Sequence, residues 1–272
     1  MIRSIAFLIS AALLIAACAT SPTGRHQLML VSPNQAVQAS ASAYPEKLKK
    51  YADEGKLNTR PQMVDRVKRI TGQLIVEAEK MYPEARSWKW EVALVDEPDT
   101  VNAWCMAGGK MAIFTGLIEK VNPTDDELAQ VMAHEISHAL ANHVAEQMSV
   151  AMASQVGLAV LSATALKDNR YRSAALTGAA LAATVAISLP YSRAAENEAD
   201  RIGIEIAAKA GFDPHAAASL WHKMGKVNKS TPPEFLNTHP AAANREKTLR
   251  ELAPQMMQYY HPNEHHLRYR FR

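Results

Sequence analysis

Within five consecutive positions this chain has two histidines and a glutamate, side chains that can bind a metal ion and transfer a proton. His134, Glu135 and His138 form a His-Glu-x-x-His motif. In a helix, positions i and i+4 lie one turn apart on one face, so both imidazoles can bind the same Zn²⁺. Glu135 is a candidate general base, because a carboxylate can take a proton from a water whose pKa the metal has lowered. Two histidines are an incomplete zinc site, and a metal-free pair of core histidines is the alternative interpretation.

A helix that carries this motif is predicted to begin near Asp125. Thr124 can act as its N-cap, with Glu127 three positions on completing a capping box. Apolar residues recur along one face of this helix at Leu128, Val131, Met132, Ile136, Ala139 and Leu140. Histidine and glutamate side chains within such a face are costly to bury unless they are paired or bound to a metal. This cost favours a zinc site over a simple core pair.

A second predicted helix, within residues 188–211, can supply the missing ligand. Pro190 lies near its start and Gly211 can cap its end. Glu196 and Asp200 are four positions apart and therefore share one face. Glu196 can be the third zinc ligand, and Asp200 can accept the N–H of a ligating imidazole and fix its tautomer. A solvated acidic face is the alternative interpretation, and the histidine motif favours the metal site.

Other schemes for a third ligand fit less well. The metzincin pattern requires glycine at position 141 and histidine at position 144, where this chain has Ala141 and Val144. His143 lies nine residues after His134, half a turn around the helix, so it cannot join the pair from there. We interpret His143 as a supporting or structural residue.

Composition bounds the class of protein. With 272 residues and 48% hydrophobic content, the chain can bury one sizeable core. The net charge of +3 and the lack of an aromatic-interleaved basic patch indicate no nucleic-acid partner. Cys105 is the one cysteine beyond the N-terminal region, so no internal disulfide is expected in a mature chain, and we interpret Cys105 as a buried apolar residue.

The N-terminus predicts a lipoprotein signal peptide over residues 1–17. Arg3 precedes an apolar stretch, and Leu14 to Cys18 resembles a bacterial lipobox. This pattern predicts lipidation of Cys18 and a membrane-anchored chain on the periplasmic side of the cell envelope. Ala19 at the next position favours the outer membrane. The alternatives are an ordinary secretory signal with an incidental cysteine, or an uncleaved anchor.

The remaining pattern predicts an α+β, mostly helical fold. Residues 18–60 are interpreted as lipid anchor and tether, helical near 33–50, and one domain is expected over 61–255. Alternating residues predict strands at 88–95, 101–106 and 110–115, which would form a small antiparallel sheet over the motif helix. An edge strand of this sheet could pair with an extended peptide, or the sheet could simply cover the site.

Two further segments complete the chain. Residues 149–190 contain two apolar, alanine-rich halves of about 17 residues, which favour buried helices or a helical lid over membrane spans. Residues 256–272 are interpreted as a solvated or flexible C-terminal tail.

Several short motifs between residues 60 and 250 form a recognisable set. They are Asn102-Ala103-Trp104 with Gly108-Gly109, Glu127-Leu128-Ala129, His134 to His138 with His143, Tyr191-Ser192-Arg193 before Glu196 and Asp200, and Thr238-His239-Pro240 with Arg245. Together they resemble zinc metallopeptidase family 48, which includes the eukaryotic CAAX prenyl protease, bacterial HtpX and periplasmic lipoprotein peptidases.

The resemblance implies a gluzincin fold with one Zn²⁺ per chain, held by His134, His138 and Glu196, with Glu135 as base. It also implies endopeptidase action on unfolded or misassembled membrane-associated proteins. The chain lacks strong transmembrane segments, so it is most similar to the lipoprotein branch involved in envelope quality control, and prenylated substrates are not expected. In that branch a histidine at the position of His239 can lie at the metal and regulate it; an exposed loop histidine is the alternative.

A different class of function is a chaperone-like outer-membrane protein assembly factor whose zinc is latent or structural. A closed zinc site without turnover would support it, whereas an open coordination position argues against it. A purely structural lipoprotein does not explain two helices with complementary ligands.

Overall fold

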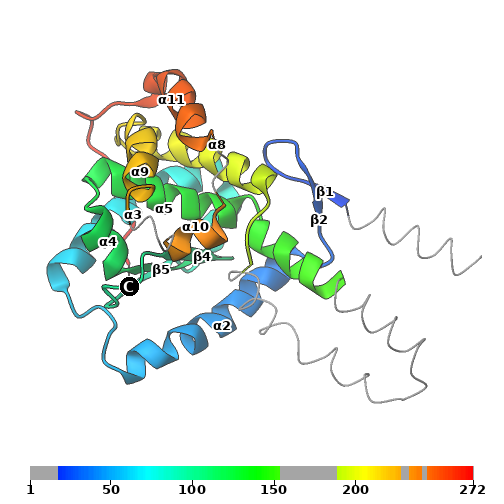
Figure 1. The fold of residues 1–272 in the computed structure, drawn as a ribbon. Helices are drawn as coiled ribbons and strands as arrows, with labels where there is room; N and C mark the ends of the chain where they lie inside the picture. The colour runs from blue at the N-terminus through cyan, green and yellow to red at the C-terminus, as the bar shows by residue number, and fades with distance from the viewer. Residues whose placement is uncertain (1–17, 154–188, 228–232, 241–243, 272) are drawn as a thin grey trace, which may run out of the picture.

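The computed structural model describes residues 18–153, 189–227, 233–240 and 244–271, which form a mostly helical α+β domain, as predicted (Figure 1). Over these residues it has two small sheets, of which the sequence predicted one. In chain order its elements are β1 (Cys18–Thr20), β2 (His26–Leu28), α2 (Pro33–Asp53), α3 (Pro61–Met81), η1 (Pro83–Ser87), β3 (Glu91–Val95), β4 (Ala103–Met106), β5 (Lys110–Phe114), α4 (Thr115–Val121), α5 (Asp125–Leu140), α8 (Arg193–Lys209), α9 (Ala216–Met224), α10 (Glu234–Thr238), α11 (Arg245–Met256) and η3 (Met257–Tyr259). A further helical segment covers residues 143–153.

The three-stranded sheet is mixed, in the order β3-β5-β4. The predicted antiparallel pairing holds for β4 and β5, which form a hairpin through Gly108 and Gly109, at φ of 78° and 74°. The prediction is wrong for β3, which pairs with β5 in parallel. Alternation of apolar and polar residues in the sequence identifies a strand, but it does not determine which strand of a hairpin a third strand pairs with. Here β3 joins β5, so β4 is an edge strand.

The sheet separates two helical layers. Alternate strand residues point to opposite faces: Val92 and Leu94 belong to the core cluster shared with α5, whereas Ala93 and Val95 belong to the cluster shared with α2. Figure 1 shows α2 and α5 on opposite sides of this sheet. The predicted helix near 33–50 is therefore present as α2, and it packs on the domain, where the Tyr44 hydroxyl donates to Met111 O at 2.8 Å.

Helix α5 lies at the centre of the domain, with every residue from 127 to 140 buried. It begins at Asp125 as predicted, because the capping box closes in both directions. The Glu127 N–H donates to Thr124 Oγ1 at 3.2 Å, and the Thr124 N–H donates to Glu127 Oε2 at 2.8 Å. Ser219 and Lys223 of α9 also donate to Glu127, so the start of α5 is attached to a distant helix.

Helix α8 packs directly against α5. Ser192 caps its start, with its side chain accepting from Ala195 N, which puts Glu196 in the first turn. Gly203 permits the close approach, since a Cβ at this position would lie 3.0 Å from the backbone nitrogen of His134. The acidic face of α8 is thereby held beside the histidines of α5.

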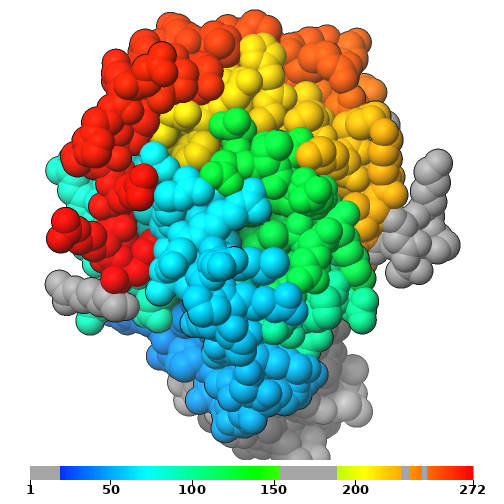
Figure 2. Space-filling view, turned by 90° about the vertical axis from the view of Figure 1, so that its left-hand side faces the viewer, coloured from blue at the N-terminus to red at the C-terminus, as the bar shows by residue number. Residues whose placement is uncertain are grey.

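The C-terminal segment, predicted as a solvated tail, lies along α3. The Tyr269 N–H donates to Gly72 O at 2.9 Å, and Tyr269 and Phe271 pack against the main core cluster. Figure 2 shows this segment, in red, next to the cyan surface of α3. The predicted signal peptide and most of the apolar stretch at 149–190 lie outside the described residues. Among the helices that the structure does describe, none has the length and apolar character to span a membrane.

Candidate metal centre

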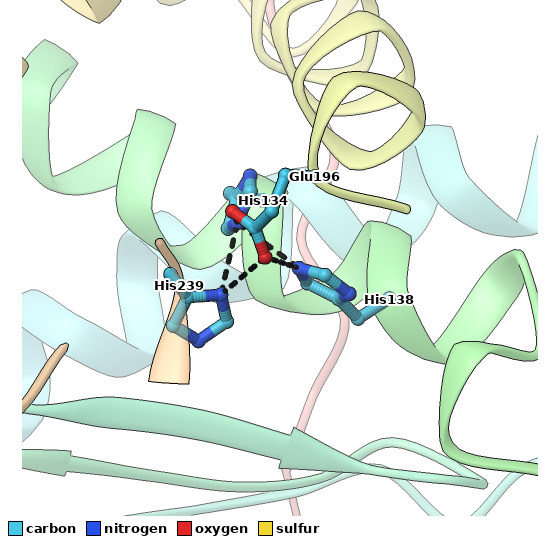
Figure 3. A group of neighbouring side chains, drawn as sticks. All are labelled: His134, His138, Glu196 and His239. Carbon is cyan, nitrogen blue, oxygen red and sulfur yellow. Dashed lines mark hydrogen bonds and ion pairs between the residues drawn. The ribbon is translucent and has the colours of Figure 1, made fainter. Parts of the chain in front are cut away.

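Four buried side chains from three parts of the chain meet above the sheet (Figure 3). His134 and His138 come from α5, Glu196 from α8, and His239 from the residue that ends α10. One potential ligand atom from each lies within 4.8 Å of all the others. The structure therefore brings together the three predicted zinc ligands and also places His239 beside them.

The spacing of these atoms fits a zinc ion. Ligand atoms around a tetrahedral zinc at 2.0–2.1 Å lie roughly 3.3 Å apart. The His134 and His138 Nε2 atoms are 3.0 Å apart, and each lies 3.4 Å from a carboxylate oxygen of Glu196. His239 Nδ1 lies 3.3 Å from His134 Nε2 and 3.0 Å from Glu196 Oε1. Imidazole nitrogens and a carboxylate are also the donors that zinc prefers over carbonyls or hydroxyls.

Burial and neighbouring charges set the protonation of these groups. Burial lowers the pKa of His138 well below its ordinary value, so this ring is neutral and has a lone pair for a metal. Burial and Arg245 oppose a charge on His134, but Asp200 and Glu196 outweigh them and raise its pKa to about 9. Burial also disfavours the charged form of Glu196, yet bonds from the three histidines hold its pKa far below the usual range. Binding of a metal cation would release the proton from His134.

Glu135 lies next to the cluster but outside the ligand set. Burial raises the pKa of its carboxyl group. Its Oε1 accepts no hydrogen bond within the described residues, although His239 Nε2 lies 3.3 Å away in poor geometry for one. A buried carboxylate oxygen without a donor can accept a proton or a hydrogen bond from a molecule that enters the site.

Asp200 and Arg245 support the ligands from the far side. Asp200 Oδ1 lies 3.0 Å from His134 Nδ1, close enough to accept the N–H of this imidazole. Arg245 donates to both Asp200 oxygens, at 2.6 and 2.7 Å, and also to Glu196. Its guanidinium lies 3.7 Å from the centre of the Trp221 ring. Sequence reasoning gave Arg245 no role, because its partners lie in helices far from it along the chain.

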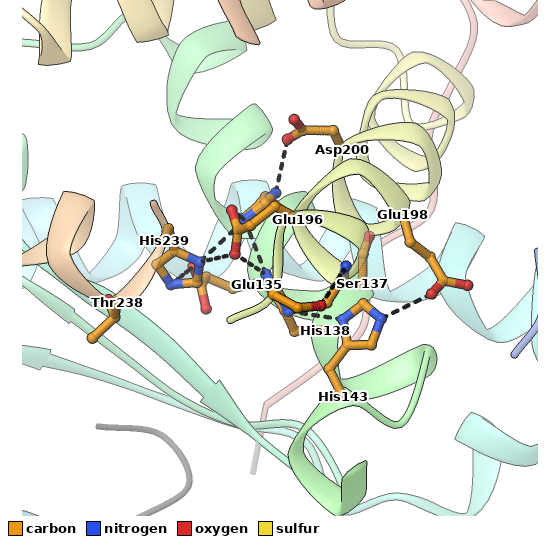
Figure 4. A network of polar contacts seen from close by, with 12 residues as sticks. Glu135, Ser137, His138, His143, Glu196, Glu198, Asp200, Thr238 and His239 are labelled. Atoms are coloured by element: carbon orange, nitrogen blue, oxygen red, sulfur yellow. Dashed lines mark hydrogen bonds and ion pairs between the residues drawn. The ribbon is translucent and has the colours of Figure 1, made fainter. Parts of the chain in front are cut away.

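His143 and Glu198 support His138 in the same way (Figure 4). The Nδ1 atoms of His143 and His138 are 2.9 Å apart, and His143 Nε2 lies 3.0 Å from Glu198 Oε2. Tyr191 stacks on the His138 ring with the ring centres 3.8 Å apart. Helix α5 ends at Leu140, and the chain turns at 141–142, where Asn142 has a φ of 57°, so that His143 faces His138. No pattern in the sequence pointed to Glu198, because residues two positions apart in a helix, such as Glu196 and Glu198, do not share a face.

Comparisons with known proteins agree with this geometry. The sequence model described as peptidase family M48 matches residues 61–253. The mitochondrial metalloendopeptidase OMA1 of Arabidopsis thaliana is 37% identical over 59% of this chain and 31% of its own length. The human OMA1 metalloendopeptidase, also mitochondrial, is 30% identical over 86% of this chain and 45% of its own length. The beta-barrel assembly-enhancing protease of Escherichia coli is 35% identical over 58% of this chain and 33% of its own length.

These relatives contradict the predicted location of the protein and show its family. The predicted location, an outer-membrane lipoprotein on the periplasmic side of the cell envelope, is contradicted because the OMA1 relatives are mitochondrial proteins. That prediction depended on a short apolar pattern before Cys18, which carries no fold information.

The chain spans about a third to a half of the length of these relatives. Since the matched region covers most of the chain and contains the whole histidine and glutamate cluster, the protein belongs to peptidase family M48, a family of zinc metallopeptidases.

Proposed function

We propose that this chain is a zinc-dependent endopeptidase in which His134, His138 and Glu196 hold Zn²⁺ and Glu135 is the general base. The observation that carries the proposal is the convergence of the ligand atoms within 4.8 Å beside a buried carboxylate that has a free acceptor oxygen. Metal ligands and a base in this arrangement are what hydrolysis of a peptide bond requires.

A zinc ion held by these residues would supply Lewis-acid chemistry, which polarises a carbonyl group and lowers the pKa of water. Glu135 takes the proton from the attacking water and later delivers it to the leaving amine. Asp200 accepts the N–H of His134 Nδ1, which would leave the Nε2 lone pair available for a metal. Arg245 balances the negative charge of Asp200 and Glu196, so both can stay ionised while buried.

The first experiment compares the parent with Glu135→Gln. Both proteins are loaded with zinc, their metal content is measured, and degradation of unfolded casein is followed. We expect the parent to cleave casein and the variant to lose about 10²- to 10⁴-fold in rate, because general base catalysis contributes that much. If the two proteins contain equal zinc, the lower cleavage rate comes from the loss of the base and not from the loss of metal. Equal cleavage by the two proteins would rule out Glu135 as the base.

The substrates we propose are misfolded or misassembled membrane-associated proteins, so the activity serves protein quality control. One support is that β4 is an edge strand, which an extended peptide can join, although all four of its residues are buried in this structure. Another is a cavity of about 270 Å³ beside it, lined by residues that include Asn102, Trp104 and Thr238, the neighbour of His239. We also propose that Cys18 carries a lipid that attaches the chain to a membrane.

The position of His239 favours a second candidate function. With His239 at the cluster, four protein side chains surround the metal position, as in zinc sites that are structural. The chain could then be a chaperone-like assembly factor with latent or structural zinc. His239→Ala separates the two: a latent peptidase gains casein cleavage in this variant, whereas a structural site loses zinc affinity and gains no activity.

A further inference from the structure

The N-terminal hairpin of β1 and β2 contacts the acidic face of α8. Arg25, in the turn before β2, donates from Nε to Glu198 Oε2 at 2.9 Å. Thr23 donates from its hydroxyl to the other oxygen, Glu198 Oε1, at 2.6 Å. The remaining guanidinium nitrogens of Arg25 bind both oxygens of Glu146, at 2.8 and 2.6 Å. Two residues of the hairpin thus fix the position of both Glu198 oxygens.

Glu198 in turn reaches a metal ligand through one imidazole. His143 lies between them, 3.0 Å from Glu198 Oε2 and 2.9 Å from His138 Nδ1. The side chains of Glu198 and His143 are 2% and 0% exposed, so no bulk water replaces these contacts. The series from hairpin to metal position is therefore Arg25, Glu198, His143 and His138.

One arrangement of protons satisfies every member of this series. If His138 binds a metal through Nε2, its single proton is on Nδ1, and this N–H donates to His143 Nδ1. His143 must then carry its own proton on Nε2 and donate it to Glu198 Oε2. Glu198 is an acceptor only, so it selects this tautomer of His143. Arg25 and Thr23 hold that carboxylate in place, and a displaced Glu198 would leave His143 free to adopt the opposite tautomer.

We propose that Arg25 is a positioning residue of the metal centre, which acts from the N-terminal hairpin through Glu198 and His143 on the ring of His138. This inference rests on the zinc site of the proposed function and adds to it a segment that lies before the matched region 61–253. Partners that orient metal-bound histidines typically change metal affinity 10- to 100-fold when removed. Because Arg25 acts through two intermediates, we expect a loss near the lower limit.

The test measures the zinc affinity of the full chain by competition with a chromophoric chelator. Arg25→Ala is expected to bind zinc roughly tenfold more weakly than the parent. The matched control is Gln27→Ala, which removes another buried anchor of the hairpin: Gln27 Nε2 donates to Ala141 O at 2.8 Å and to Glu146 at 3.1 Å, with no contact to Glu198. We expect this control to stay within about twofold of the parent.

A double-mutant cycle with His143→Asn distinguishes positioning from general loosening of the fold. If Arg25 acts through His143, Arg25→Ala adds little further loss in the His143→Asn background, whereas independent effects add. Should Arg25→Ala fail to fold, Thr23→Val removes the other hairpin donor to Glu198 and is expected to weaken zinc binding severalfold.

An unchanged zinc affinity in a folded Arg25→Ala protein, an equal loss in Gln27→Ala, or additive losses in the cycle would each overturn the proposal. Where Thr23→Val takes the place of an unfolded Arg25→Ala, unchanged zinc binding overturns it too. The readout of this test is zinc binding and not proteolysis. If the chain binds zinc but cleaves no casein, even as His239→Ala, the proposed function is refuted and this inference still stands. A parent that binds no zinc overturns both.

Discussion

Replacing Arg245 with methionine tests whether the buried charges of the metal centre depend on one cation. Arg245 is 3% exposed and binds Asp200 with two nitrogens and Glu196 with a third. Methionine can keep the apolar contact with Trp221 but leaves two buried carboxylates without their cation. Removing one partner of a buried ion pair costs about 3–5 kcal/mol in the free energy of unfolding.

The chain contains a matched control with the same contacts at the surface. Arg60 binds Asp96 with two nitrogens, at 3.2 and 2.9 Å, and Glu119 with a third, at 2.9 Å, while its side chain is 41% exposed. Exposed ion pairs contribute about 0–1 kcal/mol. The two substitutions, Arg245→Met and Arg60→Met, therefore differ mainly in burial.

The structure places the expected loss for Arg245→Met at the lower end of the buried range, about 3 kcal/mol. The reason is that His134, whose pKa is raised to about 9, can keep a positive charge beside Asp200 and Glu196 when no metal is bound. Urea unfolding followed by circular dichroism, with a chelator present so that zinc binding does not add stability, measures both variants. The reasoning is refuted if Arg245→Met loses less than about 1 kcal/mol, no more than Arg60→Met.

Two further predictions concern the supports of the motif helix. Gly203→Ala adds a Cβ at 3.0 Å from His134 N, so α8 must move away from α5. We expect this variant to bind zinc roughly tenfold more weakly than the parent, as measured by competition with a chelator. An unchanged zinc affinity would contradict this prediction. Burial raises the pKa of Glu127, but Lys223, the Thr124 N–H and Ser219 outweigh it and hold that pKa below its ordinary value. Its stabilising contribution is then fully present above the unfolded-state pKa of about 4.3 and is lost as the pH falls through the lower folded-state pKa. The difference in urea midpoint between the parent and Glu127→Gln should therefore stay constant from pH 7 to about pH 5 and shrink between about pH 4 and pH 2. A difference that stays constant down to about pH 2 would count against this assignment.

Sequence reasoning succeeded where the determining contacts are local. The capping box of Thr124 and Glu127 spans three residues, and it located the start of α5 correctly. The helical spacing of His134 and His138, and of Glu196 and Asp200, was enough to predict which side chains share a face. The structure brings all four together, and their roles as ligands and support stay predictions.

Sequence reasoning failed where contacts join distant parts of the chain. Arg245 meets His134 across 111 residues and Arg25 meets Glu198 across 173, and no local pattern marks such pairs. The parallel pairing of β3 with β5 also depends on which edge of the β4-β5 hairpin β3 joins, and the sequence of β3 alone does not determine this. The predicted location failed for a different reason, because a targeting pattern of a few residues is read by cellular machinery and leaves no trace in packing.

The order of the four cluster residues along the chain has a consequence for synthesis. His239 follows His134 by 105 residues, and Glu196 lies between them. At about 5–20 residues per second, a ribosome would take roughly 5–20 seconds to pass from the first of these residues to the last. During that interval a nascent chain has the histidine pair but lacks the rest of the cluster. The cluster is thus complete only after almost all of the matched region, residues 61–253, has left the ribosome.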